Sequence, residues 1–413
     1  MQPLSAVVVV VDRLGANFLG PYGNTWIETP AFNRLASQSL LAEFMLADSP
    51  RLELAYRAYW SGRHAMDPGD VVTSDALPAL ATRGGLRTVL MTDEPVLLDH
   101  PLAAGFEEHI LLKGEELSHS ATDIAETGMA RLFQGAADFI REQQEPFLLW
   151  VHARGMAGAW DAPAELRSQF AGEDDPLPDD STMPPALLVE PGFDPDELLK
   201  ITHAYAGQVT LLDICLGGLL DAVQENTLTS QAPLVFTSPR GYPLGEHRIV
   251  GGTEEALYGE LLHVPLLLRL PGGAGALLRT QSLVQPLDLF AAVARSIQLE
   301  GAADLPALLL DLAEGREQSR REVACAMSDN QRAIRTPAWF LRESAGDASS
   351  GLTPRWELFA KPDDRWEVNE VARRCADIPP MMVELMDAFE AAVGSGQLAN
   401  LPPIAEVLRD VWR

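Results

Sequence analysis

Apolar runs rich in β-branched residues recur through the first three-quarters of this chain of 413 residues. The first run, residues 6–11, reads AVVVVV, and four others resemble it, at residues 88–92, 146–152, 233–238 and 264–270. A strand without alternating polar positions needs apolar cover on both faces, as strands have in the parallel sheets of α/β proteins. The runs therefore predict a central, mostly parallel mixed sheet with helices on both sides.

Helix-like stretches lie between these runs, among them residues 29–39, 129–143 and 198–223. Together with the strands they predict an α/β/α sandwich. The segment 171–195, which is rich in Asp, Pro, Ser and Gly, is typical of a long surface loop.

The pattern changes after about residue 300. Short antiparallel strands are indicated at residues 322–328, 332–344 and 355–361, and a closing helix at residues 379–393. We therefore predict a core domain over residues 1–300. A smaller C-terminal domain, an antiparallel sheet plus a helix, is predicted over residues 301–413.

The chain is acidic, with a formal net charge of -28. Nucleic acids and anionic membranes favour basic surfaces, so neither is an expected partner. No stretch approaches the length needed to cross a bilayer, and residues 6–11 lack the basic flank of a signal peptide. The three cysteines, Cys215, Cys325 and Cys375, are too widely spaced for a disulfide framework or a zinc site. We expect a cytoplasmic protein.

Several ordered blocks carry a resemblance to a known family. They include VVVVVDRLGANFLGPYGN with TPAFNRLA, then SGRHAM, GLRTVLMTDEP, YAGQVTLLD, VFTSPRGYPLGEH and LYGELLHVPLLLRLPG. In this order the blocks resemble the sulfatase family of the alkaline-phosphatase superfamily, over nearly the whole chain. The resemblance implies an α/β/α sandwich that hydrolyses sulfate esters (a sulfuric ester hydrolase). It also implies a formylglycine nucleophile, made from Cys or Ser, and a calcium ion held by carboxylates.

The metal ligands that this resemblance implies are largely replaced. The family's first strand ends in two aspartates, and those positions are Asp12 and Arg13 here. A later strand of the family ends in Asp-His or Asp-Asn, and those positions are Pro239 and Arg240. Proline has no side-chain ligand, and arginine stays protonated. We therefore predict that metal coordination is lost and that no cofactor binds at this site.

The nucleophile signature is replaced as well. Counting back from Gly62 and Arg63 places the family's nucleophile at Leu52 and the arginine of its signature at Tyr56. A leucine can neither become formylglycine nor attack sulfur. A frame slip would nominate Ser49, but the spacing of the signature then fails.

Two further catalytic positions of the family are lost. Its catalytic histidine falls on Ala157 and its lysine on Gly252. Polar side chains that remain near the strand ends predict a residual pocket, formed by Asp12, Arg13, Arg240, His152 and His247. A buried carboxylate needs a cation or a proton. We therefore predict that Arg13 or Arg240 reaches Asp12 and replaces calcium with a guanidinium–carboxylate pair.

These replacements favour a pseudoenzyme, a sulfatase-like protein that has lost hydrolysis and acts by binding or by regulating a partner. Its expected partners are a small anion or sulfated ligand, and an active paralogue or a second copy of the chain. The alternative is an active sulfatase or phosphatase-type hydrolase that uses non-standard groups, drawn from Asp12, Glu53, His152 and His247. The fold cannot choose between them, because function depends on the site.

Overall fold

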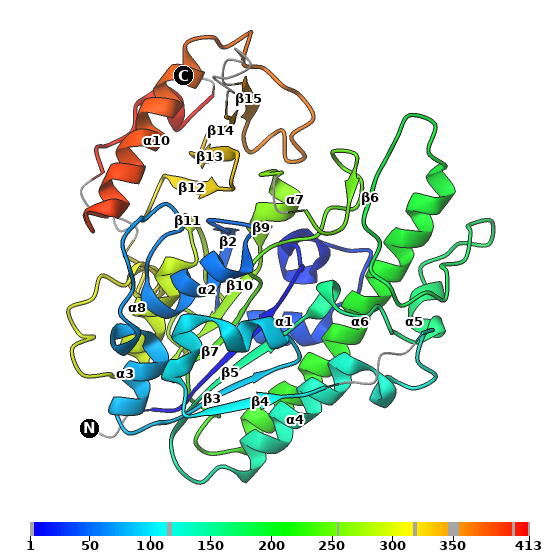
Figure 1. The fold of residues 1–413 in the computed structure, drawn as a ribbon, viewed down its shortest axis with the longest axis vertical. Coiled ribbons are helices and arrows are strands. Elements are labelled where there is room, and N and C mark those ends of the chain that lie inside the picture. Colours follow the sequence, from blue (N-terminus) through cyan, green and yellow to red (C-terminus); the bar gives the residue numbers. More distant parts are fainter. Residues whose placement is uncertain are drawn as a thin grey trace.

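The computed structural model describes residues 4–113, 118–253, 256–316, 320–345, 355–398 and 401–411. Within them the chain forms a large mixed sheet covered by helices and a small antiparallel sheet that carries one long helix (Figure 1). The small sheet lies beyond one end of the large one.

The large sheet has the strand order β11-β2-β10-β7-β1-β5-β3-β4, with β9 paired to β2. Its strands are β1 (Ala6–Val11), β2 (Leu40–Leu46), β3 (Arg87–Thr92), β4 (Glu108–Leu111), β5 (Phe147–Ala153), β7 (Leu234–Thr237), β9 (His263–Val264), β10 (Leu266–Arg269) and β11 (Arg279–Val284). Strand β10 is antiparallel to β2 and β7, and β9 is antiparallel to β2. The neighbours from β7 to β4 are parallel, as are β11 and β2. The predicted mostly parallel mixed sheet is confirmed.

Strand β1 shows why an uninterrupted apolar run belongs at the centre. Val7, Val9 and Val11 pack into one core with helices α1 (Pro30–Ala36), α4 (Gly128–Glu142) and α6 (Pro195–Glu225). Val8 and Val10 face the other core, built with α2 (Leu52–Ser61), α3 (Leu77–Arg83), α8 (Leu287–Ser296) and α9 (Leu308–Ala313). Both faces of the strand are thus covered, which makes the architecture an α/β/α sandwich.

Helix α6 corrects one expectation from the sequence. Its 31 residues, Pro195–Glu225, are long and apolar enough to span a bilayer by length and composition. Scattered polar residues such as Gln208 and Asp213 hide this in the sequence. In the structure 72% of its most apolar window is buried inside the protein, and the helix packs against α4, α1 and α5 (Ala164–Ser168).

The small sheet has the order β12-β13-β14-β15 and is antiparallel throughout. Its strands are β12 (Ala324–Met327), β13 (Gln331–Arg335), β14 (Trp339–Ser344) and β15 (Arg355–Ala360), and α10 (Ile378–Gly394) packs on them. The three predicted segments and the closing helix are therefore present, with residues 332–344 divided by a turn at Pro337. Helix α9, although it follows residue 300, packs into the core of the large sheet.

A third, two-stranded sheet takes its first strand from the segment 171–195, which was expected to be a surface loop. It pairs β6 (Leu187–Leu188) with β8 (Ile249–Val250), and the short helix α7 (Gly259–Leu262) follows. The three cysteines are all free.

Candidate functional site

The predicted site lies where three central strands end. Strand β1 pairs in parallel with β7, with Val10 opposite Thr237, and with β5, with Val11 opposite Ala153. The residues that follow β1 and β7 therefore emerge at the same edge of the sheet. That edge, at the carboxyl ends of parallel strands, is where open α/β sheets bind ligands.

Asp12 and Arg240 form a two-pronged ion pair at this edge. Nε of Arg240 lies 2.9 Å from Oδ1 of Asp12, and Nη2 lies 2.9 Å from Oδ2. The residues are buried, with exposed fractions of 2% and 8%. Burial alone would raise the pKa of Asp12, but the Arg240 guanidinium, aided by Arg13 and His152, outweighs it and holds the pKa below its usual value. The predicted arginine–aspartate contact is confirmed, and Arg240 is the arginine that makes it.

The same guanidinium joins this pair to the segment where the family carries its nucleophile. Nη1 of Arg240 donates to the carbonyl of Pro50 at 2.7 Å. Leu52, two residues further on, begins α2. Asp12, Arg240 and the start of α2 therefore meet in space, as the family pattern requires. The leucine side chain at position 52 cannot act as a nucleophile.

An aromatic cluster fills the space beside the ion pair. Tyr56 is fully buried, and its ring contacts those of Trp60 and His152. The Tyr56 hydroxyl lies 2.5 Å from Nδ1 of His152. Burial lowers the pKa of His152 to about 4, although attraction to Asp12 opposes this. The residue in the position of the family's arginine thus packs in the core and contacts a neutral imidazole.

Arg13 and Gly252 also come together. Arg13 adopts a left-handed backbone conformation, with φ of 63°, and its Nη1 donates to the carbonyl of Thr253 at 3.1 Å. A Cβ atom on Gly252 would lie 3.6 Å from Nη2 of Arg13. The arginine that follows the end of β1 therefore lies against the position at which the family has its lysine. The exposed fraction of Arg13 is only 5%.

Ala157 lies in a short turn packed on the end of β1. This 3-10 turn, Gly155–Ala157, follows β5, and the amide of Met156 donates to the carbonyl of Asp12 at 3.1 Å. Gly155 permits the close approach, because a Cβ there would lie 2.6 Å from the same carbonyl oxygen. The position of the family's histidine is thus beside Asp12, occupied by a methyl group.

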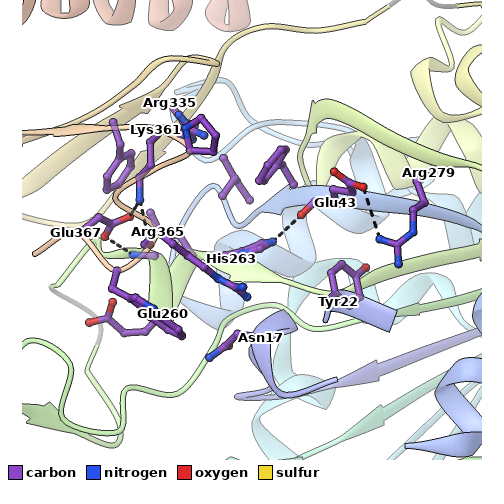
Figure 2. A pocket seen from close by; sticks show the side chains of 17 residues that line it. Asn17, Tyr22, Glu43, Glu260, His263, Arg279, Arg335, Lys361, Arg365 and Glu367 are labelled. Atoms are coloured by element: carbon purple, nitrogen blue, oxygen red, sulfur yellow. Dashed lines mark hydrogen bonds and ion pairs between the residues drawn. The ribbon is translucent and has the colours of Figure 1, made fainter. Parts of the chain in front are cut away.

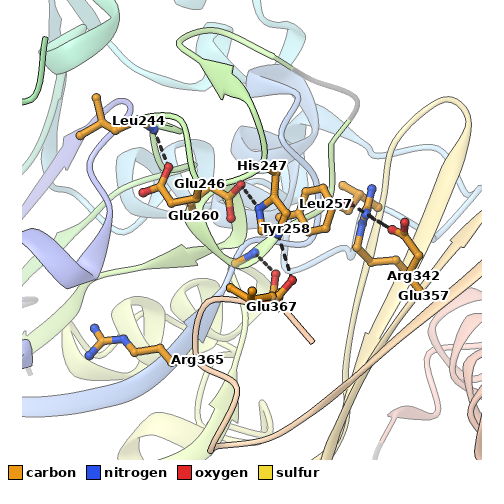
Figure 3. A network of polar contacts seen from close by, with 12 residues as sticks. Leu244, Glu246, His247, Leu257, Tyr258, Glu260, Arg342, Glu357, Arg365 and Glu367 are labelled. Atoms are coloured by element: carbon orange, nitrogen blue, oxygen red, sulfur yellow. Dashed lines mark hydrogen bonds and ion pairs between the residues drawn. The ribbon is translucent and has the colours of Figure 1, made fainter. Parts of the chain in front are cut away.

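His247 belongs to a different cluster, which connects the large sheet to the small domain (Figure 3). Its Nδ1 lies 2.7 Å from Oε1 of Glu260, and its Nε2 lies 3.1 Å from the carbonyl oxygen of Glu367. Both partners only accept hydrogen bonds, so both ring nitrogens must carry protons. The ring stacks on Tyr258 at 3.6 Å, and the Arg342 guanidinium lies on that tyrosine at 3.4 Å.

The sequence reasoning did not single out Asp48, which the structure buries between β2 and α2. Its Oδ2 accepts from the amide of Ala65 at 2.9 Å, whereas its buried Oδ1 has no hydrogen-bond partner among the described residues. Burial raises the pKa of Asp48 to about 7, against the opposing effect of that amide. The only sequence signal is its place in the segment Asp-Ser-Pro-Arg, beside the Ser49 that a frame slip would nominate.

The residues of this site do not fit a calcium ion. Calcium needs several oxygen ligands around it. Both carboxylate oxygens of Asp12 already accept from Arg240, and a guanidinium repels a cation. In the parts of the chain that the structure describes, no three His, Cys, Asp or Glu side chains are grouped so that they could hold a metal.

The fold and the site together define an α/β/α protein of hydrolase architecture, and comparison with known proteins identifies the family. The sulfatase family model matches residues 5–299, so the chain belongs to the sulfatase family. Human iduronate 2-sulfatase is 36% identical over 81 residues. That match covers 19% of this chain and only 14% of the human protein.

Solved structures show the same fold over the whole length. Phosphonate monoester hydrolase of Agrobacterium radiobacter has a TM-score of 0.71 and 16% identity, with 96% of each chain covered. BT4656, solved with its substrate D-glucosamine-2-N,6-O-disulfate, has a TM-score of 0.75 and 14% identity. That comparison covers 97% of this chain and 100% of BT4656. At such low identities the similarity establishes the fold only. The activity has to be inferred from the residues of the site.

Proposed function

We propose that this protein is a sulfatase-family member without sulfuric ester hydrolysis, a pseudoenzyme that acts by binding. The observation that carries the proposal is the buried pair in which Arg240 donates to both oxygens of Asp12. A cation that assists hydrolysis must reach those oxygens. Leu52, Ala157 and Gly252 supply no nucleophile, acid or cation in its place.

The groups considered for a non-standard hydrolase are engaged elsewhere. Asp12 is paired with Arg240, and His152 contacts Tyr56. His247 is tied to Glu260, and the Glu53 carboxylate is exposed, 3.5 Å from Arg51. No two of these four side chains are in hydrogen-bonding contact with each other. General acid–base catalysis needs such groups within reach of one reacting atom.

The test is an activity panel on the purified protein. Aryl sulfates and aryl phosphates are incubated with calcium, magnesium, manganese or zinc, alongside an active sulfatase as the positive control. We expect no product above the rate without protein, since losing several members of a catalytic set leaves little activity. Turnover by the wild type that is absent from a folded Asp12→Asn variant would establish the hydrolase alternative and overturn the proposal.

The binding role implies a ligand or a partner. A small anion or sulfated molecule, an active paralogue and a second copy of the chain are the proposed candidates, in a cytoplasmic setting. Co-purification from the native host separates a protein partner from a small ligand. An active sulfatase recovered with the chain would support a regulatory role, whereas the chain recovered alone would favour a ligand.

A further inference from the structure

A cavity of about 380 Å³ lies where the small domain meets the edge of the large sheet (Figure 2). Its walls come from β2, β11 and the α7–β9 segment on one side. Strand β13 and residues 361–367 close it on the other side. Neither Asp12 nor Arg240 lines it, so it is separate from the strand-end site. Its volume is within the range of about 300–1,000 Å³ that is usual for small-molecule sites.

Positive charge exceeds negative charge in the lining of this cavity. Four cationic side chains, Arg279, Arg335, Lys361 and Arg365, face three carboxylates in a chain whose net charge is -28. Each carboxylate already has a cation within reach, in the pairs Lys361–Glu367 (2.9 Å), Arg279–Glu43 (3.5 Å) and His247–Glu260 (2.7 Å). Arg335 and Arg365 are the two cations of the lining left without a carboxylate partner among the described residues.

Arg335 is a buried cation with no carboxylate in ion-pair contact among the described residues, and Glu367 attracts it only from a greater distance. Its Nη1 donates to the backbone carbonyls of Thr336, Pro337 and Trp339, and its guanidinium carbon lies 5.7 Å from the centre of the Phe44 ring. Burial lowers the pKa of Arg335 to about 9. A buried guanidinium is costly unless an anion compensates it, and the carbonyl dipoles do so only in part.

The cations converge on one place. Burial lowers the pKa of His263 to about 4, and repulsion from Arg365, Lys361 and Arg335 adds to this effect. Figure 2 shows Arg335 and Lys361 entering from the small domain, with Arg365 directed toward His263. An anion placed among these groups would be attracted by all three cations at once.

Aromatic rings provide the apolar part of the lining. Phe44 and Phe340 are joined by Trp366, which has an exposed fraction of 48%. The Arg365 guanidinium lies 5.2 Å from the centre of the Trp366 ring. A large exposed aromatic beside a cation cluster suits a ligand with an organic body and an anionic end.

We propose that this cavity binds a small organic ester of sulfate or phosphate. The tetrahedral oxyanion lies between Arg335 and Arg365, whose planar forks match such groups. The organic part contacts Trp366 and Phe340. This binding site does not depend on the proposed loss of hydrolysis. Ligand binding and product release are measured in separate experiments, so either proposal can fail without the other.

Calorimetric titration at constant ionic strength tests the proposal. The probes are phenyl sulfate, phenyl phosphate, inorganic sulfate and uncharged phenol, so that sulfate and phosphate esters are distinguished. We expect saturable binding of at least one phenyl ester. Arg365→Gln should raise its Kd about tenfold, the loss of roughly one charge-assisted contact. Arg373→Gln is the matched control, an exposed arginine of the same domain outside the cavity, and should leave the Kd unchanged.

Two further variants make the result specific. Trp366→Ala should weaken phenyl ester binding and leave any binding of inorganic sulfate unaltered. Arg13→Gln tests the strand-end site and should have no effect. Absence of saturable binding by both esters, equal affinities in Arg365→Gln and Arg373→Gln, binding of inorganic sulfate alone, or loss of binding in Arg13→Gln would each overturn the proposal.

Discussion

The Tyr56 hydroxyl lies 2.5 Å from Nδ1 of His152, and both side chains are fully buried beside the Asp12–Arg240 pair. Because burial lowers the pKa of His152 to about 4, the ring is neutral at pH 7. Either tautomer of the neutral ring satisfies this contact, because a hydroxyl can both donate and accept. The residue in the family's arginine position thus engages Nδ1 of His152, and the buried Nε2 of that ring has no hydrogen-bond partner among the described residues.

Tyr56→Phe should destabilise the fold without creating activity. The change removes the hydroxyl that Nδ1 of His152 contacts among the described residues and leaves a buried ring nitrogen unpaired, which costs about 1–3 kcal/mol. Urea unfolding at pH 7 measures the difference in the free energy of unfolding. A variant as stable as the wild type would show that the contact adds nothing to stability.

The His247 contacts predict a pH-dependent contribution to stability. Hydrogen bonds and attraction from Glu260, aided by the Glu367 carbonyl, outweigh burial and raise the pKa of His247 above 6.5. The folded protein then holds a proton that the unfolded chain has released. This contribution is complete below about pH 6.5 and is lost as the pH rises through the raised folded value.

His247→Gln should remove that contribution. We expect the wild type to be more stable than the variant by about 1–2 kcal/mol at pH 6, and the difference to shrink as the pH rises through the raised folded pKa of His247. Glu260 contacts the ring, and burial raises the pKa of nearby Glu246 and of Glu367, so the comparison is between the two proteins at each pH. A difference that stays constant from pH 6 to pH 9 would contradict a charged His247.

The sequence predicted the strands of the large sheet that contain long apolar runs, and it overlooked β2, β4 and β11, in which polar residues interrupt the run. Strands β1, β5 and β7 are buried along their whole length. Strand β2 carries Glu43, and the edge strand β11 carries Arg279 and Gln281. Edge strands face solvent on part of their surface, so their alternating pattern is weak and resembles that of a loop.

The part of the candidate site that lies at strand ends could be predicted from the sequence. Asp12 and Arg240 could be located because the family places its ligands immediately after β1 and β7. His247 was placed beside them through its nearness to Gly245 and Glu246 in the chain. Its partner Glu367 lies 120 residues further on, in the small domain, and a contact across that separation has no local signal.

Asp48→Asn should stabilise the protein at neutral and basic pH. The folded state keeps the Asp48 proton to about pH 7, whereas the unfolded chain releases it near 3.8. The folded state therefore binds more protons in this interval, and stability falls as the pH rises through it. An asparagine avoids this loss. The free energy of unfolding of the variant, relative to that of the wild type, should therefore rise between pH 4 and pH 8, by about 4 kcal/mol at most.

Chemical unfolding of both proteins at pH 4 and pH 8 measures that change. Asp70→Asn is the control, because Asp70 is exposed and lies nearby in the chain. If Asp48→Asn and Asp70→Asn show the same pH dependence, Asp48 is ionised in the folded protein and the prediction fails.

Removing both members of the Asp12–Arg240 pair should cost less than the two single removals added together. A single change, Asp12→Asn or Arg240→Gln, leaves an uncompensated buried group and should cost about 3–5 kcal/mol. The double variant removes both groups, so its cost should be well below the sum of the two single costs. A double-mutant cycle by urea unfolding measures the coupling. Costs that add within about 0.5 kcal/mol would show that the pair is not coupled.

Calcium should not stabilise the wild type. A ligand that binds only the folded state raises the melting temperature in proportion to ln(1 + [L]/Kd). Calcium would have to displace Arg240 from both oxygens of Asp12 and would find no second carboxylate, since the neighbouring family positions are Arg13 and Pro239. We therefore expect melting temperatures in excess calcium and in chelator to agree within about 1 °C.

The triple variant Arg13→Asp, Pro239→Asp, Arg240→Asn tests whether restoring the family's ligands restores calcium binding. It restores the carboxylates and the amide of the family pattern around Asp12, so four oxygen-bearing side chains can surround a cation. Without metal these carboxylates repel one another, and the variant should melt well below the wild type in chelator. Adding calcium should raise the melting temperature of the variant by several degrees, which corresponds to about 2–3 kcal/mol of stabilisation by calcium binding. A wild type that gains as much from calcium as the variant would mean that Arg240 does not replace the metal.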